Sequence, residues 1–503
     1  MSELSNQLQA RQDKLQKLRS LGVNPYPYRF GRTQHVSDLI ENRDSLIKNE
    51  TEIKISGRLV AFRRQGKTAF CNLKEGLHRI QLYVSQNIVG PESYEIFKCL
   101  DLGDFIGVKG NLFVTRTGEL SVNVKEFDVL GKSVRPLPVP KEKIVDGQKQ
   151  IFDQFKNMEQ RYRQRYIDLV LNDNVVDIFR KRSLIIKTTR DYLEELGYME
   201  VETPTLQSIY GGASARPFET HHNSLDMKLY LRISNELFLK RCIIGGLDRV
   251  YEIVKDFRNE GIDRTHNPEF TQIEFYQAYA DYNDMMDHFE NIYARASLAV
   301  NGTTKIQYQG QALDLTPPWE RLTMKDAIKR YAGFDVDETS DGELVDLLKA
   351  KGMELEGSFI RGIAVSEIFE AYCEDQLIQP VFIMDHPKES TPLCKIHRND
   401  PTLVERFEPY INGWELGNAY SELNDPDMQR RFFEEQVARG RGGENETHPM
   451  DEDFLTALEY GMPPTGGIGL GIDRMVMLLT DQKTIRDVIL FPLMRDSEGT
   501  SAI

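Results

Sequence analysis

The pattern of apolar and polar positions changes along the chain and divides it into four segments. Leucines recur at helical spacing near the start, so residues 1–50 are predicted to form helices. Residues 51–135 alternate apolar and polar positions in short runs that glycines interrupt. About five short strands in succession suit a small barrel, and the OB-fold is the commonest such barrel that binds nucleic acid. We expect these strands at residues 54–63, 67–74, 79–85, 104–115 and 120–130.

The rest of the chain mixes helical and strand patterns. Residues 136–160 are rich in Pro and Lys and show no periodicity, so they are interpreted as a linker before a large domain over residues 161–503. A helix is expected at residues 177–197, and strands at 271–280 and 380–385. Because strands do not alternate with helices at βαβ spacing, this α+β domain should contain an antiparallel sheet flanked by helices.

Composition narrows the class of protein. The chain has 503 residues, of which 40% are apolar, as in globular proteins. No apolar run approaches the ~20 residues that span a bilayer, and the N-terminus lacks the apolar core of a signal peptide. The five cysteines form no CxxC or Cys/His cluster. This argues against a zinc site or a disulfide framework and favours a reducing, cytoplasmic location.

The net charge of −15 argues against non-specific binding to nucleic acid. The net charge of residues 51–90 is positive instead, since they carry seven Lys or Arg residues against two acidic ones. Such a stretch is either a confined site for a polyanion or the solvated face of several strands. Charge alone does not separate these two interpretations.

Glycine-containing motifs bear on phosphate binding. The sequences QGKT at 65–68 and GKS at 131–133 both lack the first glycine of a Walker P-loop, so neither is interpreted as one. Near the C-terminus, residues 467–471 have G-x-G-x-G spacing, which differs from the dinucleotide-binding motif. They predict a glycine-lined strand that enters a helix at Asp473. Either an anion site at the helix start or a tightly packed strand–helix junction explains these glycines.

The dipeptide Asn412-Gly413 between apolar runs is a strong signal for a two-residue hairpin turn. A turn there makes Glu408 and Glu415 diagonal neighbours on one face, where like charges repel. A divalent cation bound by both carboxylates and by phosphate groups would relieve this repulsion, and Mg²⁺ uses such ligands. The alternative is a pair of exposed acids on an edge hairpin.

Beyond the turn, Asn418, Tyr420 and Glu422 share one strand face, and strict alternation would place Glu415 on the other. A β-bulge at Gly417 would redirect the strand. We therefore predict a bulge there if all of these side chains serve one site.

Three further stretches follow the barrel in a recognisable order: residues 197–206 (GYMEVETPTL), residues 257–276 (FRNEG, then THNPEFTQIEFY) and residues 467–474 (GIGLGIDR). Together they resemble motifs 1, 2 and 3 of the class II aminoacyl-tRNA synthetases, and among these the lysyl enzymes. Pro204 would be the motif 1 proline. The resemblance covers nearly the whole chain.

This resemblance implies a fold and a chemistry. The catalytic domain would bind ATP with Mg²⁺, and two chains would form a homodimer through the motif 1 region. L-Lysine and ATP would give lysyl-adenylate and pyrophosphate, and the lysyl group would then pass to tRNA(Lys) with release of AMP. A carboxylate that is already ionised at pH 7 attacks the phosphorus, so the reaction needs positioning and positive charge but no general base.

The resemblance also assigns residues to the nucleotide. Arg258 would bridge the α-phosphate and the lysine carboxylate, and Arg474, the second catalytic arginine, would contact the terminal phosphates. Phe270 would lie against the adenine. The residues expected to bind ATP are Arg258, Glu260, His266, Asn267, Phe270, Glu408, Glu415, Gly471 and Arg474, with Glu408 and Glu415 as the Mg²⁺ ligands.

Charge indicates what the amino-acid pocket holds. Glu274 and Tyr276 share one strand face, and together with Glu422 they suit a cationic side chain. Charge alone leaves arginine possible as the substrate, and only the resemblance favours lysine. The residues expected to bind lysine by resemblance are Gly212, Glu236, Arg258, Glu274, Tyr276, Asn418, Tyr420 and Glu422.

The barrel carries residues that match anticodon-reading positions of the family, namely Arg63, Phe70, Gln81 and Glu119. Phe70 would stack on the central uridine while polar groups meet the edge of the base. Without the resemblance, a lone phenylalanine in a barrel is more often a core residue.

One position departs from the bacterial pattern of the family. Many bacterial relatives have an arginine directly before the motif 2 histidine, whereas this chain has Thr265 there and Arg264 one residue earlier. Arg264 is therefore given no role. Two alternative functions use the same motifs: a lysyl transferase that modifies a protein, whose relatives lack the barrel, and an inactive tRNA-binding protein, which should have lost Arg258, Glu415 or Arg474.

Overall fold

The computed structural model describes residues 3–138, 141–145, 148–152, 155–353, 359–441 and 449–495. The chain divides into two compact units, Met1–Val176 and Asp177–Ile503. Each unit has its own hydrophobic core and is described by itself.

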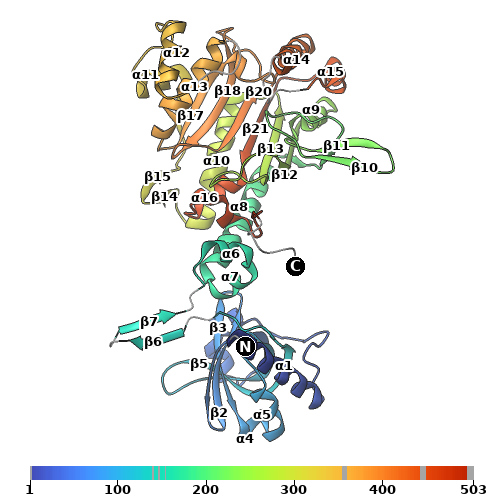
Figure 1. The fold of residues 1–503 in the computed structure, drawn as a ribbon, viewed down its shortest axis with the longest axis vertical. Coiled ribbons are helices and arrows are strands. Elements are labelled where there is room, and N and C mark those ends of the chain that lie inside the picture. The colour runs from blue at the N-terminus through green and yellow to red at the C-terminus, as the bar shows by residue number, and fades with distance from the viewer. Residues whose placement is uncertain are drawn as a thin grey trace. The chain divides into compact units, whose positions relative to one another are not determined.

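The first unit contains a closed barrel with the strand order β1-β2-β3-β5-β4 (Figure 1). All five predicted strands are confirmed, because alternating apolar residues point inward and fill the barrel. Leu18, Val36 and Leu39 of the N-terminal helices belong to the same core. The barrel strands are β1 (Glu52–Gln65), β2 (Thr68–Glu75), β3 (His78–Ser85), β4 (Phe105–Val114) and β5 (Leu120–Gly131).

Short helices and one hairpin complete this unit. The segment interpreted as a linker contains an antiparallel pair, β6 (Lys141–Val145) and β7 (Gln148–Phe152), which its lack of periodicity did not predict. The helices are α1 (Glu3–Ser20), α2 (Val36–Glu41), α3 (Arg43–Lys48), α4 (Gln86–Val89), α5 (Pro91–Lys98), α6 (Met158–Arg163) and α7 (Arg165–Leu171).

Several basic side chains of the stretch at residues 51–90 make contacts within the first unit. Lys74 is buried, donates to the carbonyl of Val170 at 2.7 Å and pairs with Asp173. Arg79 pairs with the same carboxylate at 2.7 Å, and Arg64 donates to main-chain carbonyls. These three of the seven basic side chains in this stretch are thus paired within the first unit, and these contacts do not decide between the two interpretations.

The second unit is built on one large sheet with the order β16-β17-β18-β20-β21-β13-β12-β8 (Figure 1). Its central strands are antiparallel, as predicted, but the edge strands β16 and β8 pair in parallel with their neighbours. The strands are β8 (Met199–Glu200), β12 (Arg249–Phe257), β13 (Glu269–Ala278), β16 (Glu320–Thr323), β17 (Val381–Pro387), β18 (Leu403–Ile411), β19 (Trp414–Glu415), β20 (Gly417–Ser421) and β21 (Thr465–Gly471). Smaller sheets contain β9 (Leu206–Gln207), β10 (Glu219–His222), β11 (Met227–Leu231), β14 (Lys305–Tyr308) and β15 (Gln311–Asp314).

Helices α8 (Asp173–Glu195), α10 (Tyr282–Asn301) and α16 (Ile472–Leu479) share a core with one face of this sheet. Ile273 and Phe275 of β13 and Ile468 and Leu470 of β21 point into that core. The residues that alternate with them must therefore point to the opposite face. The remaining helices are α9 (Glu236–Ile244), α11 (Met324–Tyr331), α12 (Asp341–Ala350), α13 (Arg361–Tyr372), α14 (Pro426–Arg441), α15 (Glu452–Glu459) and α17 (Ile485–Val488), with the 3₁₀ turns Glu374–Gln376 and Lys388–Ser390.

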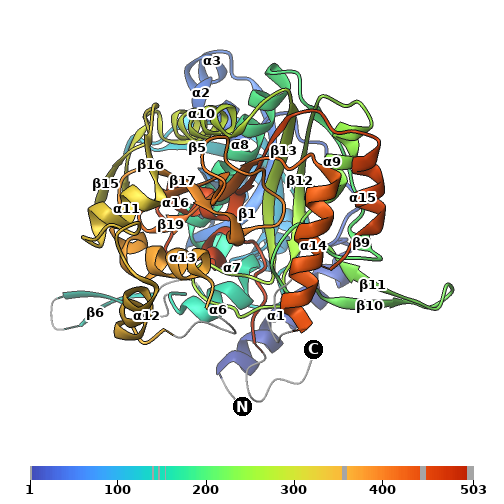
Figure 2. The same ribbon diagram turned by 90° about the horizontal axis from the view of Figure 1, so that it is seen from above.

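Two groups of helices pack beside the sheet. Helices α11, α12 and α13 share a core with β17, whereas α9, α14 and α15 share another with β12 and β13. Figure 2 shows α14 and α15 side by side. Within the described ranges, no helix is long and apolar enough to cross a membrane.

The predicted hairpin and its bulge are both confirmed. Asn412 and Gly413 have φ angles of 54° and 70°, as a type I′ turn requires. Tyr410 pairs with Glu415, but Phe407 pairs with Ala419, so the β20 side contains one extra residue between these pairs. The extra residue is accommodated around Gly417, where a Cβ atom would lie only 2.5 Å from the carbonyl oxygen of Gly469.

Candidate active site

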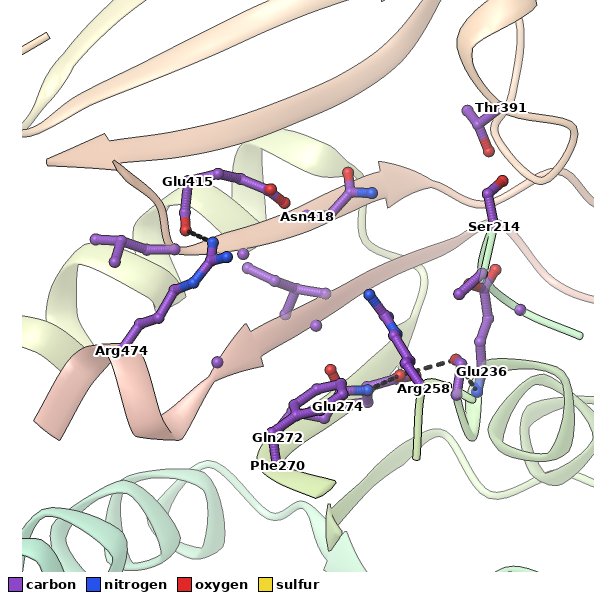
Figure 3. A pocket seen from close by; sticks show the side chains of 18 of the residues that line it. Ser214, Glu236, Arg258, Phe270, Gln272, Glu274, Thr391, Glu415, Asn418 and Arg474 are labelled. Carbon is purple, nitrogen blue, oxygen red and sulfur yellow. Dashed lines mark hydrogen bonds between the residues drawn. The ribbon is translucent and has the colours of Figure 1, made fainter. Parts of the chain in front are cut away.

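A cavity of about 430 Å³ lies on the sheet face that the helices α8, α10 and α16 leave open. The cavity is lined by side chains from the 258–268 loop, β13, the start of α9, the β18–β20 hairpin and the start of α16. Figure 3 shows Glu236, Glu274 and Arg258 toward one end and Glu415 and Arg474 toward the other. The cavity thus has chemically different ends.

One end of the cavity is acidic. Glu236, Glu274 and Glu422 line it and are 5%, 4% and 1% exposed. The buried ammonium group of Lys240 lies 2.6 Å from Glu236 Oε1 and also pairs with Glu422 Oε2. Glu274 is hydrogen-bonded by neutral groups instead. The Tyr276 hydroxyl, for example, donates a hydrogen bond to this carboxylate at 3.1 Å. Three buried carboxylates therefore have one ammonium group among them.

Burial makes these negative charges costly. Burial, reinforced by Asp256 and Glu236, raises the pKa of Glu274 well above its ordinary value. Burial also raises the pKa of Glu422 to about 8, although Lys240 acts in the opposite direction. Glu422 Oε1 has no hydrogen-bond partner within the described residues. A cationic ligand would satisfy both the charge and the free oxygen.

Glycines keep this end open. Gly212 has a φ angle of +89°, and a Cβ atom there would lie 2.7 Å from Ser234 Oγ. A Cβ atom on Gly467 would lie 2.1 Å from Glu422 Oε1 and 2.3 Å from the ring of Tyr276. Only glycine lets the backbone come this close to the acidic side chains.

Arg258 stands next to the acidic end, on the loop after β12. Its guanidinium carbon lies 5.1 Å from the centre of the Phe270 ring, and its Nε is buried without a hydrogen-bond partner among the described residues. Asn267 Oδ1 is likewise buried and unsatisfied. A cation, a flat aromatic ring and an unpaired amide oxygen together suit a nucleotide phosphate and base.

The other end holds Arg474, in the first turn of α16 as predicted. Its Nη1 donates to the carbonyl of Glu415, and its Nη2 lies 3.0 Å from His266 Nε2. Burial alone would raise the pKa of Asp263, but hydrogen bonds from Thr265 and His266 lower it to about 2. Because ionised Asp263 accepts from His266 Nδ1 at 2.8 Å, His266 Nε2 is left to accept from Arg474.

The hairpin carboxylates have the features expected of ligands for a divalent cation. Glu408 pairs with Arg406 and accepts from the Tyr410 hydroxyl at 2.8 Å. Burial and then the charge of Glu408 raise the pKa of Glu415. Partial burial and then neighbouring carboxylates raise the pKa of half-buried Glu374 to about 7. This excess of negative charge suits Mg²⁺.

The protein alone does not complete a metal cage. In the part of the chain that the structure describes, no three His, Cys, Asp or Glu side chains are grouped to hold a metal ion. A pair of glutamates would need further oxygen ligands, such as phosphates.

Comparison with known proteins relates this geometry to a family. Residues 157–495 match tRNA synthetases class II (D, K and N), and residues 53–130 match an OB-fold nucleic acid binding domain. Three relatives are named lysine–tRNA ligase. The protein from Moorella thermoacetica is 50% identical over 99% of both chains. That from Porphyromonas gingivalis is 49% identical over 98% of this chain and 86% of its own, and that from Pelotomaculum thermopropionicum is 48% identical over 99% and 96%.

The chain belongs to the lysine–tRNA ligase family of class II tRNA synthetases. Its motif 2 runs from the end of β12 through the following loop into β13, and its motif 3 runs from β21 into the first turn of α16. The two motifs are adjacent, since Gln272 pairs with Gly471 across the two strands.

The cavity brings together all the residues expected to bind ATP or lysine except Glu408, which is not among those that line it. Arg264 does not line it either, although Thr265 does. Three contributors were missed: Lys240, Asp263 and Arg406, which lines the cavity and donates to Asn418 Oδ1 at 2.9 Å. Alternation along the hairpin strand could have identified Arg406, because it lies two residues before Glu408.

In the synthetase barrel, the four expected anticodon residues lie on adjoining strands or the loop before β5. Arg63 pairs with Phe70 across β1 and β2, and Gln81 accepts from Ser121 Oγ at 2.9 Å. Phe70 faces outward between buried Ala69 and Cys71, and its ring centre lies 5.1 Å from that of Tyr83. Tyr83 was not identified from the sequence. The two half-buried rings form an aromatic surface on the outside of the barrel.

Proposed function

We propose that this chain activates L-lysine with ATP to lysyl-adenylate and transfers the lysyl group to tRNA(Lys), releasing pyrophosphate and AMP. One observation carries the proposal: a single cavity has buried carboxylates at one end and arginines beyond them. These opposite charges suit two substrates, one with two ammonium groups and one with a polyphosphate. The family of the chain supports the same reaction.

The amino acid is proposed to bind at the acidic end. Glu274, Tyr276 and Glu422 would receive the ε-ammonium group, with Tyr420 beside it. Glu236 and the backbone at Gly212 would hold the α-ammonium group, and Asn418 would support the carboxylate. An ammonium group offers three donors, and buried carboxylates with phenolic oxygens match them.

Arg258 is proposed to bridge the lysine carboxylate and the α-phosphate. This would bring the attacking oxygen and the phosphorus together and offset the negative charge that develops there. The carboxylate is ionised at neutral pH, so no residue needs to remove a proton before the attack. Arg474 would offset charge on the pyrophosphate as it leaves.

The remaining nucleotide contacts are proposed from Glu260, His266, Asn267, Phe270 and Gly471. His266 would be held in place by Asp263. Mg²⁺ would be bound by Glu408 and Glu415 together with the phosphates, and when bound it offsets their charge. Burial and then the charge of Glu408 raise the pKa of half-buried Glu415, and this supports that assignment.

We further propose a homodimer through the motif 1 region. Met199 and Leu206 are exposed apolar side chains within this segment, which supports an interface there. Sedimentation velocity would decide this, because a monomer at micromolar concentration would contradict the proposal. A cytoplasmic location fits the five free thiols.

Pyrophosphate exchange into ATP, driven by each amino acid in turn, tests the proposed reaction. Lysine should drive exchange, and the other amino acids should not. Exchange with aspartate or asparagine and none with lysine would refute the proposal.

Replacing Arg258→Ala should lower lysine-dependent exchange by about 10³-fold or more, because a charge that stabilises the transition state is lost. Binding of tRNA, measured by filter retention, should survive. The matched control is Arg430→Ala, which removes a half-exposed arginine paired with Glu452 at 3.0 Å and should leave exchange unchanged. Normal exchange in Arg258→Ala would disprove the role assigned to this arginine.

Replacing Phe70→Ala should produce the reverse pattern. Loss of a stacking ring should raise the KM for tRNA by about tenfold. Lysine-dependent pyrophosphate exchange should stay unchanged. Phe105→Ala provides a control, since Phe105 is an exposed ring at the opposite end of β4 from Phe113, the neighbour of Tyr83. Aminoacylation kinetics equal to those of the unmodified protein would count against anticodon stacking by Phe70.

A further inference from the structure

Lys240 is a buried cation for which the proposed reaction has no role. It lies on α9 one helical turn after Glu236, and its side chain is 0% exposed. Its ammonium group contacts Glu236 Oε1 at 2.6 Å and also Glu422 Oε2, which belongs to the segment after β20. The same cation thus connects two carboxylates that come from distant parts of the sequence.

These contacts leave each carboxylate only partly available to a ligand. Glu422 turns Oε2 toward Lys240, whereas Oε1 lies over Gly467 at the floor of the cavity and has no partner among the described residues. Glu236 also directs one oxygen at Lys240. Neither carboxylate therefore presents both of its oxygens to the cavity.

Glu274 is restricted as well, but by neutral donors. Its Oε1 accepts from Ser234 Oγ at 2.9 Å and from Gln272 Nε2 at 2.6 Å, and its Oε2 accepts from the Tyr276 hydroxyl at 3.1 Å. Both oxygens of this carboxylate are therefore already hydrogen-bonded, although its negative charge still acts on a ligand.

The two basic amino acids make different demands on such a pocket. A guanidinium group is a planar fork that binds best to both oxygens of one carboxylate, whereas an ammonium group takes single oxygens from several partners. Charge by itself does not separate lysine from arginine, since both side chains carry one positive charge. The orientation of the carboxylate oxygens does separate them.

We propose that Lys240 is a specificity-determining positioning residue, which holds one oxygen of Glu236 and one of Glu422 and so favours an ammonium over a guanidinium substrate. This inference rests on the proposed lysine-activating function. In addition, the positive charge of Lys240 leaves three carboxylates with a formal net charge of −2, which matches the two ammonium groups of lysine.

The test is pyrophosphate exchange driven by L-lysine and by L-arginine in the full-length protein. In Lys240→Met the freed oxygens should reorient. The KM for lysine should rise by about tenfold, and the lysine-to-arginine ratio of kcat/KM should fall by at least about tenfold. The KM for ATP should change much less, which separates this role from general damage to the fold.

A second variant covers the case in which Lys240→Met does not fold. Lys240→Gln keeps an amide that can donate to both carboxylates without the charge, so the ratio should fall by less. Lys132→Met is the matched control, because Lys132 is an equally buried lysine that pairs with Asp101 and Asp104 at 2.6 and 2.9 Å in the first unit. Its lysine-to-arginine ratio should not change.

An unchanged ratio in the Lys240 variant that folds, or an equal fall in Lys132→Met, would overturn the inference. Exchange by the unmodified protein distinguishes failure of the proposed function from failure of the role assigned to Lys240. If it shows no exchange with lysine, the proposed function fails. If it is active while the ratio in the variants stays constant, only the role of Lys240 fails.

Discussion

Carboxylate groups buried beside one another with too few cations are the constraint on which this active site depends. Glu236, Glu274 and Glu422 are nearly inaccessible to solvent, and Lys240 is the cation that contacts two of them. Removing unpaired charges from water costs free energy, and the raised pKa values of these groups reflect that cost. The free protein therefore has buried acidic groups without enough positive charge beside them, and a ligand with ammonium groups would supply that charge.

The fold keeps these charges in place by separating the two faces of one sheet. Alternate residues of β13 and β21 enter an apolar core, and their neighbours face the cavity. Asp473 secures this arrangement, because it accepts from the Thr271 main-chain N–H at 2.7 Å and pairs with Arg182 of α8 at 2.5 Å. The start of α16, which carries Arg474, is thereby fixed against β13.

Local rules were sufficient to predict much of this arrangement. The Asn412-Gly413 turn set the register that makes Glu408 and Glu415 neighbours, and the glycine at 417 indicated the bulge. Alternation along β13 correctly separated Glu274 from Phe275. The individual roles of the site residues came from family resemblance, which local rules could not replace.

Other features depend on contacts between distant segments. The short strands β8 and β16 pair in parallel with β12 and β17, respectively, and these partners lie far along the chain. Helical spacing could have linked Lys240 to Glu236, but its pairing with Glu422 requires the folded sheet. The long-range contacts of Lys74 likewise could not be inferred from the charge of the barrel segment.

The central claim is that the acidic end takes up the positive charge of the substrate, and calorimetry of L-lysine binding at pH 7 tests it most directly. Because burial raises the pKa of Glu422 to about 8, this carboxyl group binds more protons near pH 7 in the free pocket than an ordinary glutamate does. A bound ammonium group favours the ionised form, so protons should be released, and the binding heat should vary with the ionisation enthalpy of the buffer. Glu422→Gln should release fewer protons. Binding heats that are independent of the buffer, or net proton uptake, would contradict the account.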